Sequence, residues 1–491
     1  MGQILATPGV YIEEKSAFPS SAVQVATAVP AFIGYTEFAI RDSKSLINVP
    51  TRITSLSEFH QFFGAGPTTT FAVAEDDEKG FSLEIDKDSQ YNLYRSMRLF
   101  FANGGSTCYI VSVGNYESPI SAKDLNDPAT ESGIPTLLKY PEPTMLVIPD
   151  AILLEENDCY ALQQAMLMHC GADTKSRIAL LDVFSGTDAR TWDDNDPIIK
   201  SREGVGANFL QWGAMYYPAL NTTIVQGDEV DFNNVSNLDA LIPLLDAQAD
   251  ALYGDDAELI KAEIAKLSAE EKNDLSLHQT LMAKIPLYGA ILGEVRNNLN
   301  ILPPSGAMAG AISMVDGEVG VFKSPANISL GSVVSPTVNL TSKEQEDLNL
   351  PLNGKAVNAI RTFPGKGVIV WGARTLDGNS QDWRYISVRR TVTMIEQSLK
   401  AASEAYVFEP NVVNTWVSIR GMMSNFLKDQ WKSGALAGST PEEAFSVDVG
   451  LGVTMTPTDV LDGIMRITVK LAVTRPAEFI VITFQQQMQQ S

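Results

Sequence analysis

The stretch TMLVIPDAILLEENDCYALQQAMLMHCGADTKSRIALLDVF, residues 144–184, decides the fold of this chain. It opens with an apolar run over residues 144–150, which predicts a strand. Residues 158–171 predict a helix, and the β-branched and aliphatic run over residues 177–184 predicts a second strand. Strand, helix and strand with short connections are typical of a βαβ unit, so the sequence predicts an α/β fold here.

The segments before this unit predict elements of the same kind. Residues 92–105 predict a helix that ends at two glycines, and residues 107–113 predict a strand. The apolar residues of this helix share one face: Leu93, Met97, Phe100 and Phe101. Residues 22–35 predict a buried strand. Residues 55–64 predict a short helix with Ser57 as its N-cap and Gly64 just after its end.

Three segments differ in character from the α/β region. Residues 66–90 indicate an irregular, acidic surface excursion. Residues 221–300 contain 14 acidic and 5 basic residues at helical spacing, which predicts an inserted acidic helical sub-domain. Residues 302–313, LPPSGAMAGAIS, indicate a turn-rich junction.

The last third predicts a strand at residues 367–376 and two long helices, at residues 385–408 and 414–436. In the second helix we expect a buried stripe of four residues: Trp416, Ile419, Met423 and Phe426. Residues 464–474, IMRITVKLAVT, alternate apolar and polar side chains, which predicts a half-buried strand.

Both ends of the chain look like strands that lack a local partner. At the start these residues are Pro8, Gly9, Val10, Tyr11 and Ile12. At the end they are Phe479, Ile480, Val481, Ile482, Thr483 and Phe484. An exposed apolar edge strand is an aggregation hazard unless it pairs with another copy, and a head-to-tail contact between copies that does not close builds a filament. The alternative is that each terminal strand pairs inside its own subunit.

The composition is that of an ordinary globular protein of 491 residues, long enough for two to four domains. Cys108, Cys159 and Cys170 are too few and too uneven for a disulfide framework. No secretory signal and no apolar run of membrane-helix length is visible, so we expect synthesis in the cytoplasm and no direct membrane insertion.

The formal net charge of −23 disfavours nucleic acid as a partner. Residues 351–491 hold 14 basic and 12 acidic residues, whereas the whole chain holds 36 and 59. This split suggests that the acidic part of the chain faces solvent and that residues 351–491 contact another protein. The alternative is that the acidic part is only a solvated surface.

The sequence shows no catalytic, cofactor or metal constellation. The only histidines are His60, His169 and His278, and the spacing of Cys159, His169 and Cys170 does not suit zinc. The run TFPGKGVIV, residues 362–370, lacks the first glycine and the final Ser or Thr of a phosphate loop, and predicts a glycine-rich turn before a strand. We expect no enzyme activity and no cofactor.

Blocks along nearly the whole chain resemble contractile tail sheath proteins of bacterial viruses, R-type pyocins and extracellular contractile injection systems. The blocks are TPGVYIEE (7–14), VPAFIGYTE (29–37), FFANGGSTCYIVSV (100–113), PPSGAMAGAIS (303–313), GVFKSPAN (320–327), NAIRTFPGKGVIVWGARTL (358–376), WRYISVRRTVTMIEQSL (383–399), FLKDQWKSGALAG (426–438) and RPAEFIVITFQQ (475–486). The acidic stretch at 221–300 is absent from the shortest family members.

The resemblance implies a structural, non-enzymatic subunit that forms stacked hexameric rings wound helically around an inner tube protein. Baseplate and tail-terminator proteins would cap this homo-oligomer. Terminal strands of neighbours would join one sheet, and contraction would drive the tube through a target envelope. The particle would be a phage tail or a released extracellular injection particle, a choice the sequence leaves open.

The resemblance also implies a division of the chain into an inner core and outer domains. We expect a linking arm and first core strand at 1–40, an outer α/β domain at 41–220 that returns at 301–354, and the acidic insertion at 221–300. Residues 355–491 would form the inner core, a mixed sheet with two long helices. Similar sheaths touch the tube through basic residues of a C-terminal helix, for which the candidates are Arg420, Lys428 and Lys432. The alternative is that these three are ordinary solvated side chains.

Two other functions are weighed against this one. A secretion-system sheath of the type VI kind is usually split over two chains, whereas this single chain holds both terminal strands. A cytoplasmic α/β enzyme is the alternative from another class.

Overall fold

The computed structural model describes residues 22–268 and 274–481 of the chain. These residues form two compact units. The small unit comprises residues 22–25 and Met394–Thr474, and the large unit comprises the remaining described residues, including Arg475–Val481. This division differs from the expected domain ends at 40 and 355, because the first core strand and the strand that begins at Gly367 both belong to the large unit.

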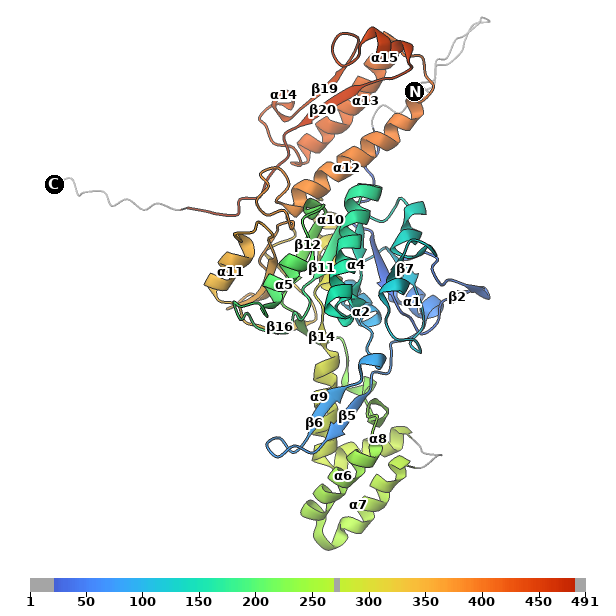
Figure 1. The fold of residues 1–491 in the computed structure, drawn as a ribbon, viewed down its shortest axis with the longest axis vertical. Coiled ribbons are helices and arrows are strands. Elements are labelled where there is room, and N and C mark those ends of the chain that lie inside the picture. The colour runs from blue at the N-terminus through green and yellow to red at the C-terminus, as the bar shows by residue number, and fades with distance from the viewer. Residues whose placement is uncertain (1–21, 269–273, 482–491) are drawn as a thin grey trace, which may run out of the picture. The chain divides into compact units, whose positions relative to one another are not determined.

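A nine-stranded sheet forms the centre of the large unit (Figure 1). Six neighbouring strands run parallel, in the order β7 (Cys108–Ser112), β1 (Pro30–Gly34), β10 (Met145–Val147), β11 (Ile178–Asp182), β12 (Gly213–Tyr217) and β17 (Asn358–Phe363). Antiparallel strands extend both edges: β4 (Thr51–Ile53) next to β7, then β18 (Gly367–Val370) and β15 (Ile328–Ser329) beyond β17. The register places Met145 of β10 opposite Ile178 of β11, so the predicted βαβ unit is confirmed.

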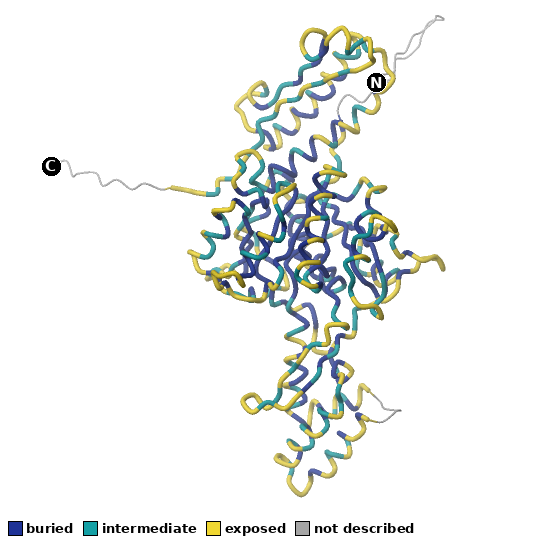
Figure 2. The backbone as a smooth tube through the Cα atoms, viewed as in Figure 1, coloured by how far each residue is buried: buried dark blue, intermediate teal, exposed yellow. Residues whose placement is uncertain are grey.

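Helices cover both faces of this sheet, and the strands between them are buried (Figure 2). One face carries α4 (Glu156–Met168), α5 (Pro197–Gly204) and α11 (Ser342–Asn349). The other carries α1 (Leu56–Phe63), α2 (Leu93–Ala102) and α10 (Ser305–Glu318). Side chains of β11 alternate between the faces, with Leu181 in one cluster and Leu180 in the other. The mixed α/β fold is therefore as predicted.

Residues 302–313 are not the predicted turn-rich junction, since most of them lie in α10. Its small residues allow close packing against α2. A Cβ at Gly310 would lie 2.4 Å from the carbonyl oxygen of Phe100, and one at Gly306 would lie 2.8 Å from that of Ser96. Glycines that resemble turn residues thus serve a helix–helix contact. The N-cap of α1 is also Ser55 rather than Ser57, because the Ser55 side chain accepts from the Glu58 N–H.

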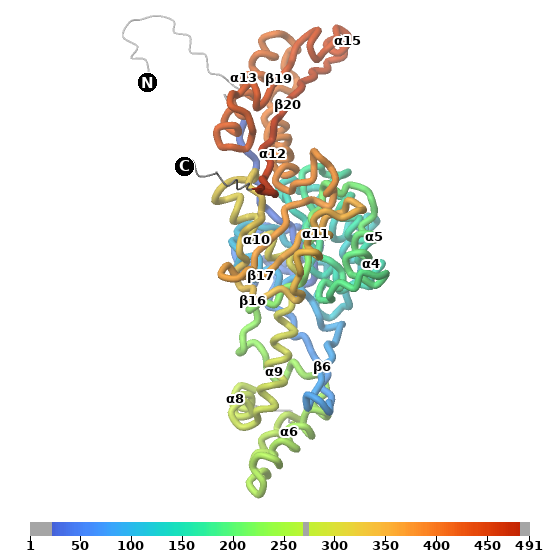
Figure 3. Tube along the Cα trace, turned by 90° about the vertical axis from the view of Figure 1, so that its left-hand side faces the viewer, coloured from blue at the N-terminus to red at the C-terminus, as the bar shows by residue number. Residues whose placement is uncertain are grey.

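The predicted irregular excursion at 66–90 is instead a hairpin of β5 (Phe71–Ala74) and β6 (Ser82–Ile85). It packs with the acidic insertion, which is helical as predicted: α6 (Leu238–Tyr253), α7 (Ala257–Ile264), α8 (Asp274–Lys284) and α9 (Pro286–Leu299). Figures 1 and 3 show the hairpin beside these helices, beyond one end of the sheet. The Asn237 side chain bonds the backbone N–H and carbonyl of Val73, each at 2.8 Å, and so ties the two segments together.

Short elements connect these layers. A three-stranded sheet joins β13 (Leu220–Thr222), β14 (Ile301–Leu302) and β16 (Val333–Pro336). The remaining strands and α-helices of the large unit are β2 (Ile40–Arg41), β3 (Lys44–Ser45), α3 (Ala122–Leu125), β8 (Asn126–Asp127) and β9 (Ser132–Gly133).

Both predicted long helices are present: α12 (Ile386–Ser403) and α13 (Val413–Lys432). The small unit contains all of α13 and the part of α12 that begins at Met394. It also contains α14 (Pro441–Ala444), α15 (Pro457–Leu461) and an antiparallel pair, β19 (Phe445–Val449) and β20 (Ile467–Leu471). In α13 the predicted residues Ile419, Met423 and Phe426 are buried, but Trp416 is only half-buried. The burial of β20 alternates, as its sequence predicts.

Candidate assembly surfaces

The end of the described chain is held to the large unit mainly through Glu478. Arg374 donates to its carboxylate from Nε at 3.0 Å and from Nη2 at 2.6 Å. The Tyr385 hydroxyl donates to it at 2.9 Å and the Asn349 amide at 2.7 Å. Burial disfavours the charged form of Glu478, but these donors outweigh it and hold the pKa of Glu478 below its ordinary value. Glu478 is therefore a charged anchor at neutral pH.

Immediately after this anchor the chain becomes apolar and exposed. Phe479, Ile480 and Val481 are 66%, 79% and 89% exposed. The segment runs out from the large unit, and Figure 2 colours it as exposed (Figures 1 and 2). In the single chain these three residues are not part of a strand. Three consecutive exposed apolar residues are costly in water, which indicates a surface that a partner covers.

The other predicted strand residues lie outside the described residues. These are Pro8, Gly9, Val10, Tyr11, Ile12, Ile482, Thr483 and Phe484. The first described residues after the N-terminal segment are tied to the small unit. The Val25 N–H donates to Ser398 Oγ at 3.0 Å, and Gln430 donates to the Gln24 side chain at 3.2 Å.

The small unit offers open strand edges. Within its described residues, β19 and β20 form a sheet of only two strands, so each has one edge without a third strand. A two-stranded sheet gains stability from a third strand or a covering helix. Helix α13 packs against β19. The outer edges of β19 and β20 therefore remain available for pairing with a further strand.

Three of the 14 basic residues of the C-terminal region are buried. Arg374, Arg389 and Arg390 are nearly inaccessible and lie in the large unit, where Arg390 pairs with Asp316 at 2.6 Å. Met394–Thr474 holds 6 basic and 9 acidic residues. The positive balance of residues 351–491 therefore comes from residues outside the small unit.

The three tube-facing candidates are all exposed on α13, but they are not equivalent. The Arg420 guanidinium donates to the Val449 carbonyl at 2.6 Å, and Lys432 lies 3.7 Å from the carboxylate of Asp429. Lys428 has no ion pair with any described residue, so it is the candidate most available to an external acidic group.

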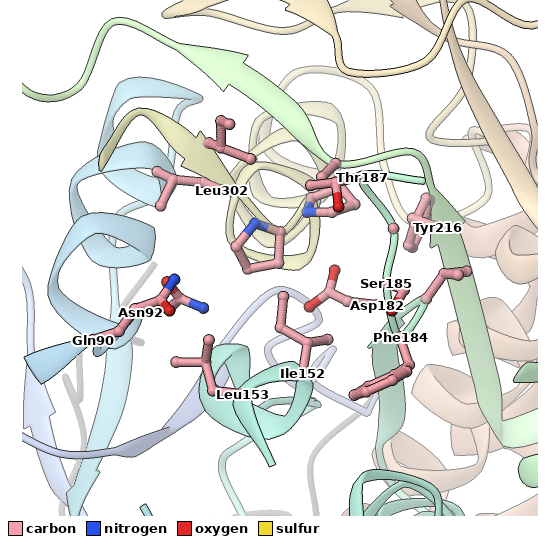
Figure 4. A pocket seen from close by; sticks show the side chains of 16 residues that line it. Gln90, Asn92, Ile152, Leu153, Asp182, Phe184, Ser185, Thr187, Tyr216 and Leu302 are labelled. Carbon is pink, nitrogen blue, oxygen red and sulfur yellow. The ribbon is translucent and has the colours of Figure 1, made fainter. Parts of the chain in front are cut away.

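A cavity of about 180 Å³ lies at the carboxyl ends of β11 and β12 (Figure 4). Asp182 faces it and accepts from the Ser305 N–H at 2.8 Å and from Ser305 Oγ at 2.5 Å. Burial raises the pKa of Asp182 to about 7. The carboxyl group caps the N-terminus of α10, so its role is structural, and none of the three histidines lines the cavity.

The other residues weighed for chemistry are structural as well. His169 is buried beside Arg177, and burial together with this cation lowers its pKa to about 3. In residues 22–268 and 274–481, no group of His, Cys, Asp or Glu could hold a metal ion. The glycine-rich turn joins β17 to β18, with Gly365 and Gly367 at φ 76° and 78°. Among the described helices, none is long and apolar enough to cross a membrane.

Sequence reasoning missed the anchor of the C-terminal segment. A glutamate directly before an apolar run was a usable signal for Glu478. Arg374 carried no such signal, because its partner is 104 residues away in the chain.

Comparison with known proteins gives a consistent result. The profile of the phage tail sheath C-terminal domain family matches residues 379–487. The sheath of the PVC extracellular contractile injection system in its contracted state is 27% identical, covering 99% of each chain, with a TM-score of 0.60. The contracted helical sheath of the anti-feeding prophage (AFP) is 28% identical, covering 99% of this chain and 100% of that chain, with a TM-score of 0.61. A chain of the six-fold symmetrised AFP baseplate is 27% identical over 99% of this chain and 100% of that one, with a TM-score of 0.59. No curated protein sequence matches the chain.

Proposed function

We propose, from the premise that this chain is a structural subunit of a contractile sheath, that it polymerises helically around an inner tube and contracts to drive that tube through a target envelope. The observation that carries the proposal is the full-length likeness to sheath subunits solved in the contracted state. The AFP baseplate neighbour, described as six-fold symmetrised, supports stacked hexameric rings in contact with a baseplate.

The subunits are linked by exchanged strands. Residues 479–484 would span about 20 Å as a strand, and the five-residue strands β19 and β20 about 16 Å, at about 3.3 Å per residue. A donated segment of this length would extend the two-stranded sheet of a neighbour and cover its own exposed side chains. Residues 8–12 would add the second donated strand.

Contraction requires no nucleotide, because the energy is stored when the sheath assembles. Surface buried between subunits as they close supplies the work. At about 25 cal/mol per Å², a few hundred Å² per subunit yields several kcal/mol, multiplied over the array. The exchanged strands hold neighbours together while the rigid bodies rotate.

The two units would take different roles in the sheath. The small unit, with the N-terminal arm and the C-terminal segment, forms the inner, linking part, and the α/β region with the acidic insertion lies outside. Lys428, with Arg420 and Lys432, faces an acidic tube. In a co-sedimentation assay with inner tubes, K428E should bind less than K400E, which changes an exposed lysine of α12. The sheath belongs to a phage tail or a released extracellular particle.

Negative-stain microscopy of the purified chain tests the proposal. Long striated cylinders are expected from the wild type, whereas V481P should form only short cylinders, and only at a higher protein concentration, since proline removes a backbone donor and disfavours a central strand. Compact single particles from the wild type at every concentration, with enzymatic turnover, would favour the enzyme alternative instead.

A further inference from the structure

We propose that the Arg374–Glu478 ion pair fixes the point from which the donated C-terminal segment leaves the large unit, which makes Glu478 a positioning residue for sheath assembly. This inference rests on the proposed strand donation. It goes beyond that donation, because it assigns a residue outside the donated strand that acts through the three apolar residues that follow it.

The anchor is rigid because Arg374 is itself held from several sides. Its backbone N–H donates to Asn358 Oδ1 at 2.7 Å, and its carbonyl accepts from the Asn358 amide at 2.8 Å. Nη1 donates to the Gly378 carbonyl at 3.1 Å, and the guanidinium lies over the Tyr385 ring at 5.9 Å. Asn358 is the first residue of β17, so Glu478 is fixed to the central sheet through a buried arginine.

The pair has the geometry of a strong interaction. Two parallel N–H···O bonds join Arg374 to the carboxylate, and such bidentate, charge-assisted pairs set direction as well as energy. A second ion pair on the same segment is longer and more exposed to solvent. Arg475 lies 3.6 Å from Asp382 and both side chains are largely exposed, so this pair contributes little.

The position of the anchor gives it a role in assembly. Glu478 directly precedes Phe479, so the first donated residue emerges from a fixed point with little freedom. Fixing the root of a binding segment lowers the entropy lost when that segment pairs, which lowers the protein concentration needed for assembly. The ion pair also keeps the first residue of the donated strand at a fixed place on the large unit while subunits rotate.

The experiment compares the full-length wild type with E478A, R475A, V481P and the double variant E478A/V481P. The critical concentration for cylinder formation is measured by sedimentation and negative-stain microscopy, after circular dichroism has shown that each variant is folded. E478A should raise this concentration about tenfold or more, and R475A should stay within about twofold of the wild type. If E478A does not fold, E478Q, which removes the charge but keeps an acceptor, should show a smaller shift in the same direction.

The double variant separates a positioning role from general destabilisation. If Glu478 acts only through the donated strand, E478A/V481P should assemble no worse than V481P. A wild-type critical concentration for both E478A and E478Q, with V481P defective, overturns the anchor and leaves strand donation standing. Further loss in the double variant also overturns it. Normal cylinders from V481P overturn strand donation and the anchor together.

Discussion

Asp182 is a buried and Glu478 a partly buried carboxyl group of the large unit, and their pKa values move in opposite directions. Asp182 meets only the neutral donors of Ser305, so desolvation dominates and raises its pKa. Glu478 meets the charge of Arg374 and two further donors, which outweigh desolvation. The charge of the partner, rather than burial alone, decides the outcome.

The raised pKa of Asp182 predicts a pH dependence. A carboxyl group whose folded pKa is raised contributes stability below its unfolded pKa of about 4, and this is lost as the pH rises toward about 7. Between pH 4 and pH 7, the wild type should lose about 3 kcal/mol of unfolding free energy relative to D182N. Urea unfolding across this range measures the difference. D382N, at an exposed aspartate of the same unit, should follow the wild type. Parallel pH curves for D182N and the wild type would contradict the prediction.

At the scale of elements, the contact between α10 and α2 depends on glycine. No turn or positive φ requires a glycine at position 310; it is present because the Phe100 carbonyl lies where a Cβ would be. This is why the composition of residues 302–313 resembled a junction. Small residues mark both turns and close helix contacts, and only the neighbouring helix distinguishes the two.

The expected effect of G310A is a loss of about 1–3 kcal/mol of unfolding free energy, because the two helices must move apart. G317A is the matched control in the same helix, where a Cβ would meet nothing within 4 Å. It should be neutral or stabilising by up to about 1 kcal/mol, since alanine favours the helix more than glycine does. Thermal or denaturant unfolding of both variants gives the comparison, and equal effects would contradict the assigned contact.

The hairpin of β5 and β6 was not predictable from residues 66–90 alone. Phe71 and Val73 are buried only because α6, α9 and nearby segments of the insertion cover them from more than 150 positions away in sequence. Without that partner their apolar side chains look like isolated residues in an acidic loop. Helices α12 and α13, by contrast, were predictable because their apolar periodicity is local.

At the scale of the whole molecule, the two chain ends are rooted separately, the N-terminal one in the small unit and the C-terminal one in the large unit. Deleting residues 1–20 should leave a folded monomer, with unchanged thermal unfolding, that builds no long cylinders. Deleting residues 486–491, a polar tail beyond the predicted strand, should leave assembly intact. Sheath length in negative stain is the measurement, and long cylinders after the first deletion would refute donation of the N-terminal strand.

The sequence by itself determined the α/β class, the βαβ unit and the two long helices, because periodicity and run length depend only on neighbours along the chain. The two unpartnered terminal strands stay a prediction, of which the structure describes only Phe479, Ile480 and Val481. The tertiary structure decided which charges are accessible. Arg374, Arg389 and Arg390 count toward the positive balance of residues 351–491, yet all three are buried. It also decided that Arg374 meets Glu478, since an ion pair across 104 residues forms only when the fold brings both ends together. Local patterns fix elements, whereas burial and long-range pairing fix the sites that those elements build.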